Sequence, residues 1–268
     1  MIKNIDPQKY EALIRKIKVK KRIVLALMIL AAILILIFGT PLYINIGDVF
    51  VDRQGLPFGV VILLALLAAF FSIIANSFII YPVVSAIDVE CDPEKHLVLN
   101  SALNRQKSMD HIFTVDYFYL GDFSASLGCA ERMTTSANPE MVKVGLFNLA
   151  RCHFFMGNLE ALCFAADGYE KLLVKGKSAK PHHLKLWSSI SLMVAIAQKD
   201  MSAMENLKRI EPWNNSKATE GFVNYLMGVA AYELGETQDA IYRFGAVKEF
   251  CSKTILSELS QEYLDKLK

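Results

Sequence analysis

Residues 56–84 have the sequence LPFGVVILLALLAAFFSIIANSFIIYPVV, which contains no charged residue. A helix rises about 1.5 Å per residue, so roughly 20 apolar residues cross a hydrocarbon core of about 30 Å. The stretch exceeds that minimum, so the helix it predicts is expected to tilt, or to leave the bilayer at Pro82. The alternative, a buried core helix of a soluble protein, normally has a shorter apolar run. The stretch therefore predicts a transmembrane helix.

A second uncharged stretch, residues 23–46, precedes the first one. Its apolar run is unbroken over residues 23–38, and residues 39–44 extend it to spanning length. A cleaved signal peptide is disfavoured, because its apolar region would be shorter and no small-x-small cleavage site follows. The two segments together explain why 53% of the 268 residues are hydrophobic. They predict a two-helix membrane anchor over residues 23–87.

The residue types within the two predicted spans favour an anchor over a transporter. No Asp, Glu, Lys, Arg or His lies inside either span, whereas proton and ion pathways usually contain such groups. Residues with small or short side chains recur along the second span, and we expect them to let the first span approach closely. These residues are Ala65, Ala68, Ala69, Ser72 and Asn76.

The distribution of charge predicts the orientation of the anchor. Eight Lys and Arg and two acidic residues precede the first span, whereas the connecting loop, residues 45–54, carries one Arg and two Asp. The positive-inside rule then places both termini in the cytoplasm. The five cysteines, odd in number and without CxxC spacing, are typical of reduced thiols in that compartment. We expect an integral protein of the plasma membrane.

Residues 1–22 form a basic cytoplasmic segment in which residues 6–22 are predicted to be helical. Asp6-Pro7 is a typical helix start, and apolar residues from Tyr10 to Ile17 recur at helical spacing. Two interpretations remain open: an amphipathic helix on the anionic inner leaflet, or a simple topology signal. The residues expected near the lipid headgroups are Lys16, Lys18, Lys20, Lys21 and Arg22.

Residues 88–268 have the composition of a soluble helical domain. They contain 20 Lys and Arg against 23 Asp and Glu, so the domain lacks the basic character of a nucleic-acid binder. Prolines are sparse, and neither an Asn-Gly or Asp-Gly hairpin signal nor a β-branched run of strand length occurs. The whole chain is therefore predicted to be all-α.

Four segments of this domain share one pattern: an amphipathic helix, a tight turn and a second amphipathic helix. The turn positions are separated by 36, 42 and 36 residues, and they are Gly121, Gly157, Lys199 and Gly235. Glycine favours the left-handed conformation that often ends a helix. A polar residue follows the turn in each unit, and three of these residues are expected to cap the next helix. These residues are Asp122, Asn158 and Asp200.

This pattern resembles the tetratricopeptide repeat over about residues 93–250. The last unit matches best, because its small, turn and aromatic residues stand where the family has them. They are Met227-Gly228, Gly235-Glu236, Ala240 and Phe244. The second unit, with Leu149-Ala150, Gly157-Asn158 and Tyr169, is similar. The resemblance implies an α-solenoid of helical hairpins; an unrelated helical bundle is the alternative.

Terminal helices are expected to cap the stack of repeats. Residues 93–104, with Asp92 as N-cap, are predicted to form the first of them, and residues 252–267 the last.

No catalytic, cofactor or metal motif is present, so the sequence does not indicate an enzyme. P-loop, GxGxxG, GxSxG and HExxH patterns are absent. His182-His183 lacks partner ligands at metal spacing and is expected in a solvated first helical turn. Cys152 and His153 point to different helix faces and are interpreted as core residues.

The resemblance implies a concave groove, lined by the first helix of each pair, that binds a protein or peptide segment. The residues that map to this groove are His111, Phe118, Tyr119, Phe147, Arg151, Phe155, Tyr225 and Glu233. Arg151 is the candidate partner for a carboxylate, because its planar guanidinium favours bidentate contacts. These aromatic residues are alternatively explained by packing between repeats.

The sequence thus predicts a membrane-anchored, non-enzymatic scaffold for protein–protein interaction at the cytoplasmic face. An accessory subunit of a transport or secretion complex is the alternative, and an enzyme with an unrecognised helical site is a third.

Overall fold

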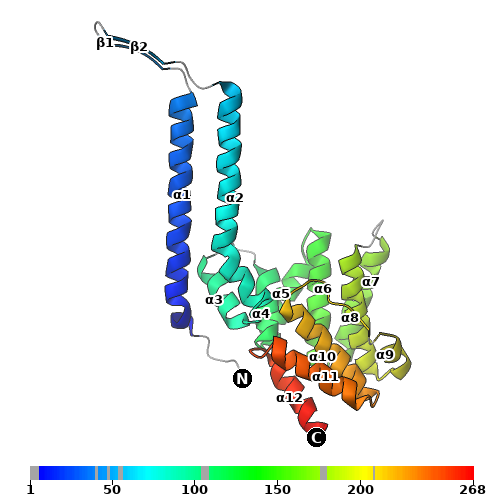
Figure 1. Ribbon diagram of the computed structural model, residues 1–268. Coiled ribbons are helices and arrows are strands. Elements are labelled where there is room, and N and C mark those ends of the chain that lie inside the picture. Colours follow the sequence, from blue (N-terminus) through cyan, green and yellow to red (C-terminus); the bar gives the residue numbers. More distant parts are fainter. Residues whose placement is uncertain are drawn as a thin grey trace. The chain divides into compact units, whose positions relative to one another are not determined.

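The computed structural model describes residues 6–39, 42–46, 49–53, 57–103, 109–175, 180–207 and 209–268 (Figure 1). The chain divides into two compact units. One comprises Pro7–Pro82, and the other comprises Val83–Lys268.

The first unit is a pair of long helices joined through a β-hairpin (Figure 1). A 3-10 turn, Pro7–Tyr10, leads into α1, Glu11–Gly39. Strands β1, Leu42–Ile46, and β2, Val49–Arg53, pair in antiparallel orientation, with Ile46 opposite Val49. Helix α2 then runs from Phe58 to Asp88, so its last residues belong to the second unit.

The helical prediction for residues 6–22 is confirmed, since Pro7–Tyr10 form a 3-10 turn and α1 continues from Glu11 without interruption into the apolar segment. The predicted end of the first span needs correction. The first span was predicted to extend through residues 39–44, but α1 ends at Gly39 and a strand begins at Leu42. Glycine and proline disfavour a helix around residues 39–41, and the β-branched and aromatic residues that follow favour a strand. The all-α prediction is therefore wrong for this hairpin.

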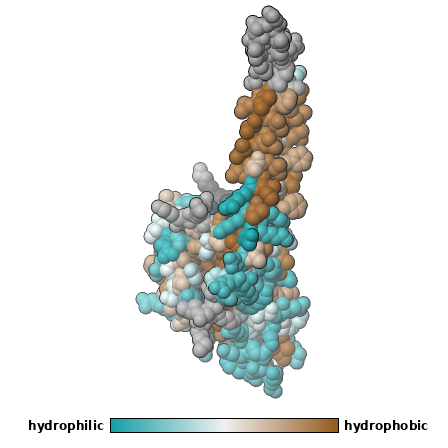
Figure 2. All heavy atoms as spheres, turned by 90° about the vertical axis from the view of Figure 1, so that its left-hand side faces the viewer, coloured by the Kyte–Doolittle hydropathy of each residue, from teal (hydrophilic) through white to brown (hydrophobic). Residues whose placement is uncertain are grey.

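Helices α1 and α2 are both long and apolar enough to cross a membrane. Most of their large apolar residues are exposed, among them Phe78, which is 75% exposed. Figure 2 shows this apolar surface gathered over the two-helix unit. Exposed apolar surface of this extent marks contact with a membrane or with another protein.

The second unit is helical, and its described part contains no strand. Its helices after α2 are α3 (Pro93–Leu103), α4 (Asp110–Tyr119), α5 (Phe123–Thr134), α6 (Pro139–Phe155), α7 (Leu159–Lys175), α8 (Pro181–Gln198), α9 (Met201–Leu207), α10 (Lys217–Glu233), α11 (Thr237–Phe250) and α12 (Ile255–Lys266). Helices α4 to α9 each pack against the next one, and so do α10 to α12. Asp92 accepts a hydrogen bond from the Lys95 N–H and caps α3, as predicted.

All four predicted turns are confirmed. The turn residues have left-handed backbones, with φ of 81°, 71°, 57° and 76° at Gly121, Gly157, Lys199 and Gly235. Each turn repeats two hydrogen bonds that satisfy free carbonyl groups at the helix end. In the first, the N–H groups of Gly121 and Asp122 donate to the carbonyl oxygens of Phe118 and Tyr117. The three predicted caps are formed by the side chains of Asp122, Asn158 and Asp200.

Helix α10 is the centre of the domain. Every residue from Ala218 to Ala231 except Glu220 is buried, and α10 contacts α8, α9, α11 and α12. The ring of Phe222 on α10 lies 5.8 Å from that of Phe118 on α4.

Helix α4, near the start of the domain, also meets the helices at its end. Helix α12 contacts α4, and the Tyr119 hydroxyl on α4 donates a 2.7 Å hydrogen bond to the Ala218 carbonyl on α10. An open stack, in which each repeat touches only its neighbours, does not have such contacts.

The same closure joins two cysteines that are 160 residues apart in sequence. The Sγ atoms of Cys91 and Cys251 lie 3.0 Å apart, both are free thiols, and both are buried. The hydrogen bond between them, together with burial, raises the pKa of the Cys91 thiol. The spacing of the cysteines in the sequence does not predict this contact.

Gly228 is required by the close packing of α10 on α11. A Cβ atom at this position would lie 2.9 Å from Cε1 of Phe244, which is closer than side chains normally approach. A Gly228→Ala substitution is expected to lower the free energy of unfolding by about 1–3 kcal/mol, because it overpacks the core. Chemical denaturation of the full chain in detergent measures this change.

Gly245, in the middle of α11, is the matched control because its added Cβ would meet nothing within 4 Å. Gly245→Ala is expected to raise the free energy of unfolding by up to about 1 kcal/mol through helix propensity. Equal effects of the two substitutions would contradict the close packing of α10 on α11.

Candidate functional site

The second unit contains a pocket of about 370 Å³ between its helices. The pocket brings together the end of α2, α3, α4, α6, α8 and the start of α10, which are distant in sequence. The lining residues are Ile87, Asp88, His96, His111, Ile112, Val115, Tyr119, Val144, Phe147, Asn148, Arg151, His182, Leu186, Trp213, Asn214, Ser216, Ala218 and Thr219. About half of the lining residues have apolar or aromatic side chains, and the polar side chains lie between them. This combination is typical of ligand-binding pockets.

Arg151 is the most unusual of these residues, because its charged side chain is buried. The residue is 2% exposed, and its Cζ lies 3.7 Å from the centre of the Phe118 ring. The rings of Tyr119, Phe147 and Phe222 surround the guanidinium at 5.5–5.6 Å. Aromatic faces attract a cation, and the attraction is strongest where water is excluded.

The hydrogen bonds of the Arg151 guanidinium are incomplete. Its Nη2 donates a 2.6 Å bond to Oδ1 of Asn148, whose own amide donates to the Val144 carbonyl. Nε is buried and has no partner among the described residues. No ion pair to Arg151 occurs in the part of the chain that the structure describes. Burial lowers the pKa of Arg151, and the nearby Tyr119 hydroxyl opposes that change.

A helix N-terminus forms the adjacent wall of the pocket. Ser216 caps α10 by accepting a 3.1 Å hydrogen bond from the Thr219 N–H, and both residues line the pocket. The N-terminus of a helix carries a partial positive charge. This wall and the Arg151 guanidinium therefore favour negative charge in the same space.

A buried, hydrogen-bonded pair of His96 and Asp116 closes another side of the pocket. Nδ1 of His96 lies 2.6 Å from Oδ1 of Asp116, which is fully buried and whose Oδ2 has no partner among the described residues. Burial raises the pKa of Asp116 from 3.8 to about 6, although its hydrogen bond with His96 acts in the opposite direction. Burial also raises the pKa of Asp88 in the pocket wall.

A cluster of Glu140, His182 and His183 corrects the expectation that the histidine pair lacks partner ligands. The candidate ligand atoms of these residues lie within 4.8 Å of one another, and Nε2 of His183 is 2.7 Å from Oε2 of Glu140. Lys143 and Lys180 approach Oε1 of the same carboxylate at 3.4 and 3.8 Å. The lysines already neutralise the Glu140 carboxylate, so the cluster is explained as an ion-pair network.

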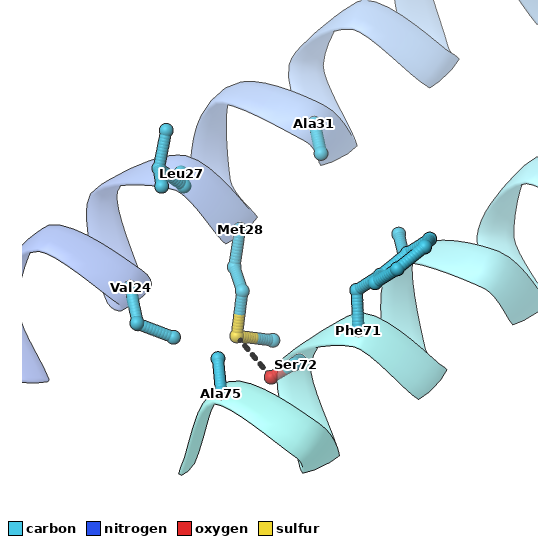
Figure 3. Close-up of a pocket in the computed structure, with 8 residues that line it drawn as sticks. Val24, Leu27, Met28, Ala31, Phe71, Ser72 and Ala75 are labelled. Carbon is cyan, nitrogen blue, oxygen red and sulfur yellow. Dashed lines mark hydrogen bonds between the residues drawn. The ribbon is translucent and has the colours of Figure 1, made fainter. Parts of the chain in front are cut away.

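A second pocket, of about 310 Å³, lies between α1 and α2 of the first unit. Ala68, Ser72 and Ala75 of α2 line it opposite Val24 and Met28 of α1. Figure 3 shows Met28 and Ser72 directed toward one another, with the Ser72 hydroxyl 2.8 Å from the Met28 sulfur. The small residues do not produce the expected close approach, since no described Cα atom of α1 lies within 8 Å of one in α2. Methionine fills part of this gap.

The structure separates the eight predicted groove residues into three groups. His111, Tyr119, Phe147 and Arg151 line the 370 Å³ pocket. Phe118, Phe155 and Tyr225 belong to the aromatic core, where the rings of Phe155 and Tyr225 stack 5.3 Å apart. Glu233, half-buried, lies at the end of α10. Binding of a partner to these residues stays a prediction.

Several pocket residues are absent from the sequence-based set. Asn148 is three positions before Arg151 on the same helix, so helical spacing alone would have identified it. Trp213 and Asn214 precede α10 in an irregular segment, where no periodic pattern marks them.

The pH dependence of stability tests the burial of Asp116. Its folded-state pKa of about 6 exceeds the ordinary value of 3.8, so its ionisation costs stability as the pH rises from about 4 to about 6. Asp116→Asn is expected to remove this loss, and thermal melting of the full chain across that pH range measures it. Asp167→Asn, at an exposed position on α7, is the control. Parallel pH profiles for wild type and Asp116→Asn would contradict the burial.

Comparisons of this chain with protein-family models, curated proteins and solved structures gave no match. Its function is therefore inferred from the chain's own residues.

Proposed function

We propose that this protein is a membrane-anchored, non-enzymatic scaffold that presents a tetratricopeptide-like domain to a protein or peptide partner in the cytoplasm. The observation that carries the proposal is the repeated helix–turn–helix unit, whose turns at Gly121, Gly157, Lys199 and Gly235 share a left-handed backbone and the same two hydrogen bonds. Proteins built from helical hairpins in series use their helix surfaces to bind partners, and in this closed array the outer faces of the second helices remain exposed.

The packing within the last hairpin supports the tetratricopeptide likeness. Gly228 lets the Phe244 ring approach the α10 backbone, and Ala240 is completely buried between the helices. A small residue facing an aromatic one across a helix pair explains why both residue types occur at these positions.

Exposed apolar side chains on the second helices provide additional surface for a partner. Phe164 on α7 is 77% exposed, and Tyr242 on α11 is 68% exposed. Aromatic residues are enriched in protein–protein interfaces relative to the rest of a protein surface.

The membrane location is supported by α1 and α2, because most of their large apolar side chains are exposed. The proposed location is the plasma membrane, and the proposed topology has both termini on its cytoplasmic side. The Lys and Arg residues between positions 16 and 22 of α1 would then lie beside anionic lipid headgroups.

The gap between α1 and α2 favours a second candidate function, an accessory subunit of a transport or secretion complex. Two spans that leave an apolar space lined by small residues offer a site where a helix of a larger complex can pack. The spans, rather than the helical domain, would then contact the other subunits.

Exchange of the anchor distinguishes the two functions. Residues 23–82 are replaced by an unrelated two-span anchor of the same orientation, so that Val83–Asp88 stay with the helical domain, and partners are captured by crosslinking in native membranes. The scaffold is expected to retain its partners, because its binding surface lies in the helical domain. Loss of all partners would contradict the scaffold and favour the subunit.

Two further variants complete this experiment. Ala68→Leu with Ser72→Leu fills the gap between α1 and α2, and a scaffold tolerates this change whereas a subunit does not. A reporter fused after Lys268 is expected to be active in the cytoplasm; activity only on the other side would contradict the topology.

A further inference from the structure

We propose that the pocket around Arg151 is a binding site for a monocarboxylate with an apolar body, the carboxylate pairing with the Arg151 guanidinium. The ligand is either a free organic acid or the C-terminal residue of a polypeptide. This inference concerns the helical domain alone and goes beyond the scaffold function, so either can fail without the other.

The first argument is the charge of Arg151. A guanidinium stays protonated in proteins, and a buried charge without a counter-charge costs several kcal/mol. Asn148 supplies a hydrogen-bond acceptor at 2.6 Å and the Tyr119 hydroxyl lies close by, but neither neutral group neutralises the charge. A ligand carboxylate would supply both the missing charge and further acceptors, since Arg–carboxylate pairs are frequently bidentate.

The aromatic rings around Arg151 do not make the ligand unnecessary. Phe118, Phe147 and Phe222 attract the cation through their faces, yet they accept no conventional hydrogen bond. Nε remains without a partner among the described residues. The stack on Phe118 instead holds the plane of the guanidinium in one orientation, as a binding site for a planar carboxylate requires.

The remaining walls of the pocket determine the body of the ligand. Ile112, Val115, Val144 and Leu186 are apolar, and Trp213 adds an aromatic face. Arg151 is the one Lys or Arg among the lining residues of the described chain, whose acidic and histidine residues are Asp88, His96, His111 and His182. One guanidinium pairs with one carboxylate, so a ligand with a single carboxylate fits this side chain. A volume of about 370 Å³ lies in the range of small-molecule sites. Phosphorylated ligands, with two negative charges, fit these walls poorly.

The N-terminus of α10 is a second, independent feature that favours an anion. Ser216, Ala218 and Thr219 of this terminus line the same pocket as Arg151. Its partial positive charge adds to that of the guanidinium.

Fluorescence of Trp213 provides a direct readout of binding. The chain has two tryptophans, and Trp187, which does not line the pocket, stacks on Tyr169 with ring centres 6.2 Å apart. A Trp187→Phe background therefore leaves Trp213 as the reporter. Full-length protein in detergent is titrated with 3-phenylpropionate and with its neutral amide, 3-phenylpropionamide. We expect the acid to change Trp213 fluorescence in a saturable way and to bind at least about tenfold more tightly than the amide.

Substitution of Arg151 tests the role of the guanidinium. Arg151→Met is expected to reduce affinity for the acid about tenfold or more, whereas Arg151→Lys keeps part of it. Arg243→Met, on α11 outside the pocket, is the matched control and should bind as wild type. Thermal melting in each case reports whether the variant folds.

Three outcomes would overturn the proposal: no saturable change with the acid, equal affinity for acid and amide, or unchanged affinity in a folded Arg151→Met variant. The first two are measured without any change at Arg151, so they hold even if the Arg151 variants do not fold. A peptide that ends in Phe, with a free or an amidated C-terminus, identifies the source of the carboxylate. Tighter binding of the free-terminus peptide than of 3-phenylpropionate assigns the site to a polypeptide, and weaker binding assigns it to a free acid.

Discussion

The burial of α10 on every side is the constraint on which the helical domain depends. Fourteen positions from Ala218 to Ala231 include a single unburied residue, so no face of the helix is left for solvent. A helix of this kind must be surrounded by other elements. The chain meets this requirement by packing α8, α9, α11 and α12 around it, while Phe222 reaches α4 and α6 through contacts with Phe118 and Phe147. The array of hairpins thereby closes on itself.

Closure also explains the pocket. Where α4, α6 and α8 converge on the start of α10, the side chains do not fill the enclosed space, and about 370 Å³ remains. Tyr119 ties α4 to α10 at this point through its hydrogen bond to Ala218. Arg151 lies on the inner face of α6 and is therefore buried by the same closure that creates the pocket. The fold therefore leaves the Arg151 charge without a counter-charge, which a bound ligand can supply.

Local chemistry was sufficient to predict the turns and caps of the domain. Gly121, Gly157 and Gly235 permit left-handed backbones, and the polar residues after the turns have capping side chains. Contacts between distant parts of the chain leave no such periodic signal. The Cys91–Cys251 contact, the approach of Glu140 to His183 and the closure onto α4 therefore could not be predicted. Four of the eight groove residues do line the pocket, because first-helix positions face the interior in a closed array as well as in an open one.

The contact between Phe118 and Phe222 is the most direct test of closure, because the two rings belong to the first and last hairpins. A double-mutant cycle with Phe118→Leu, Phe222→Leu and the double variant, measured by chemical denaturation of the full chain, gives their coupling energy. Rings 5.8 Å apart in an edge-to-face arrangement predict a favourable coupling of about 1 kcal/mol. Additive effects, with a coupling within about 0.3 kcal/mol of zero, would contradict a closed domain.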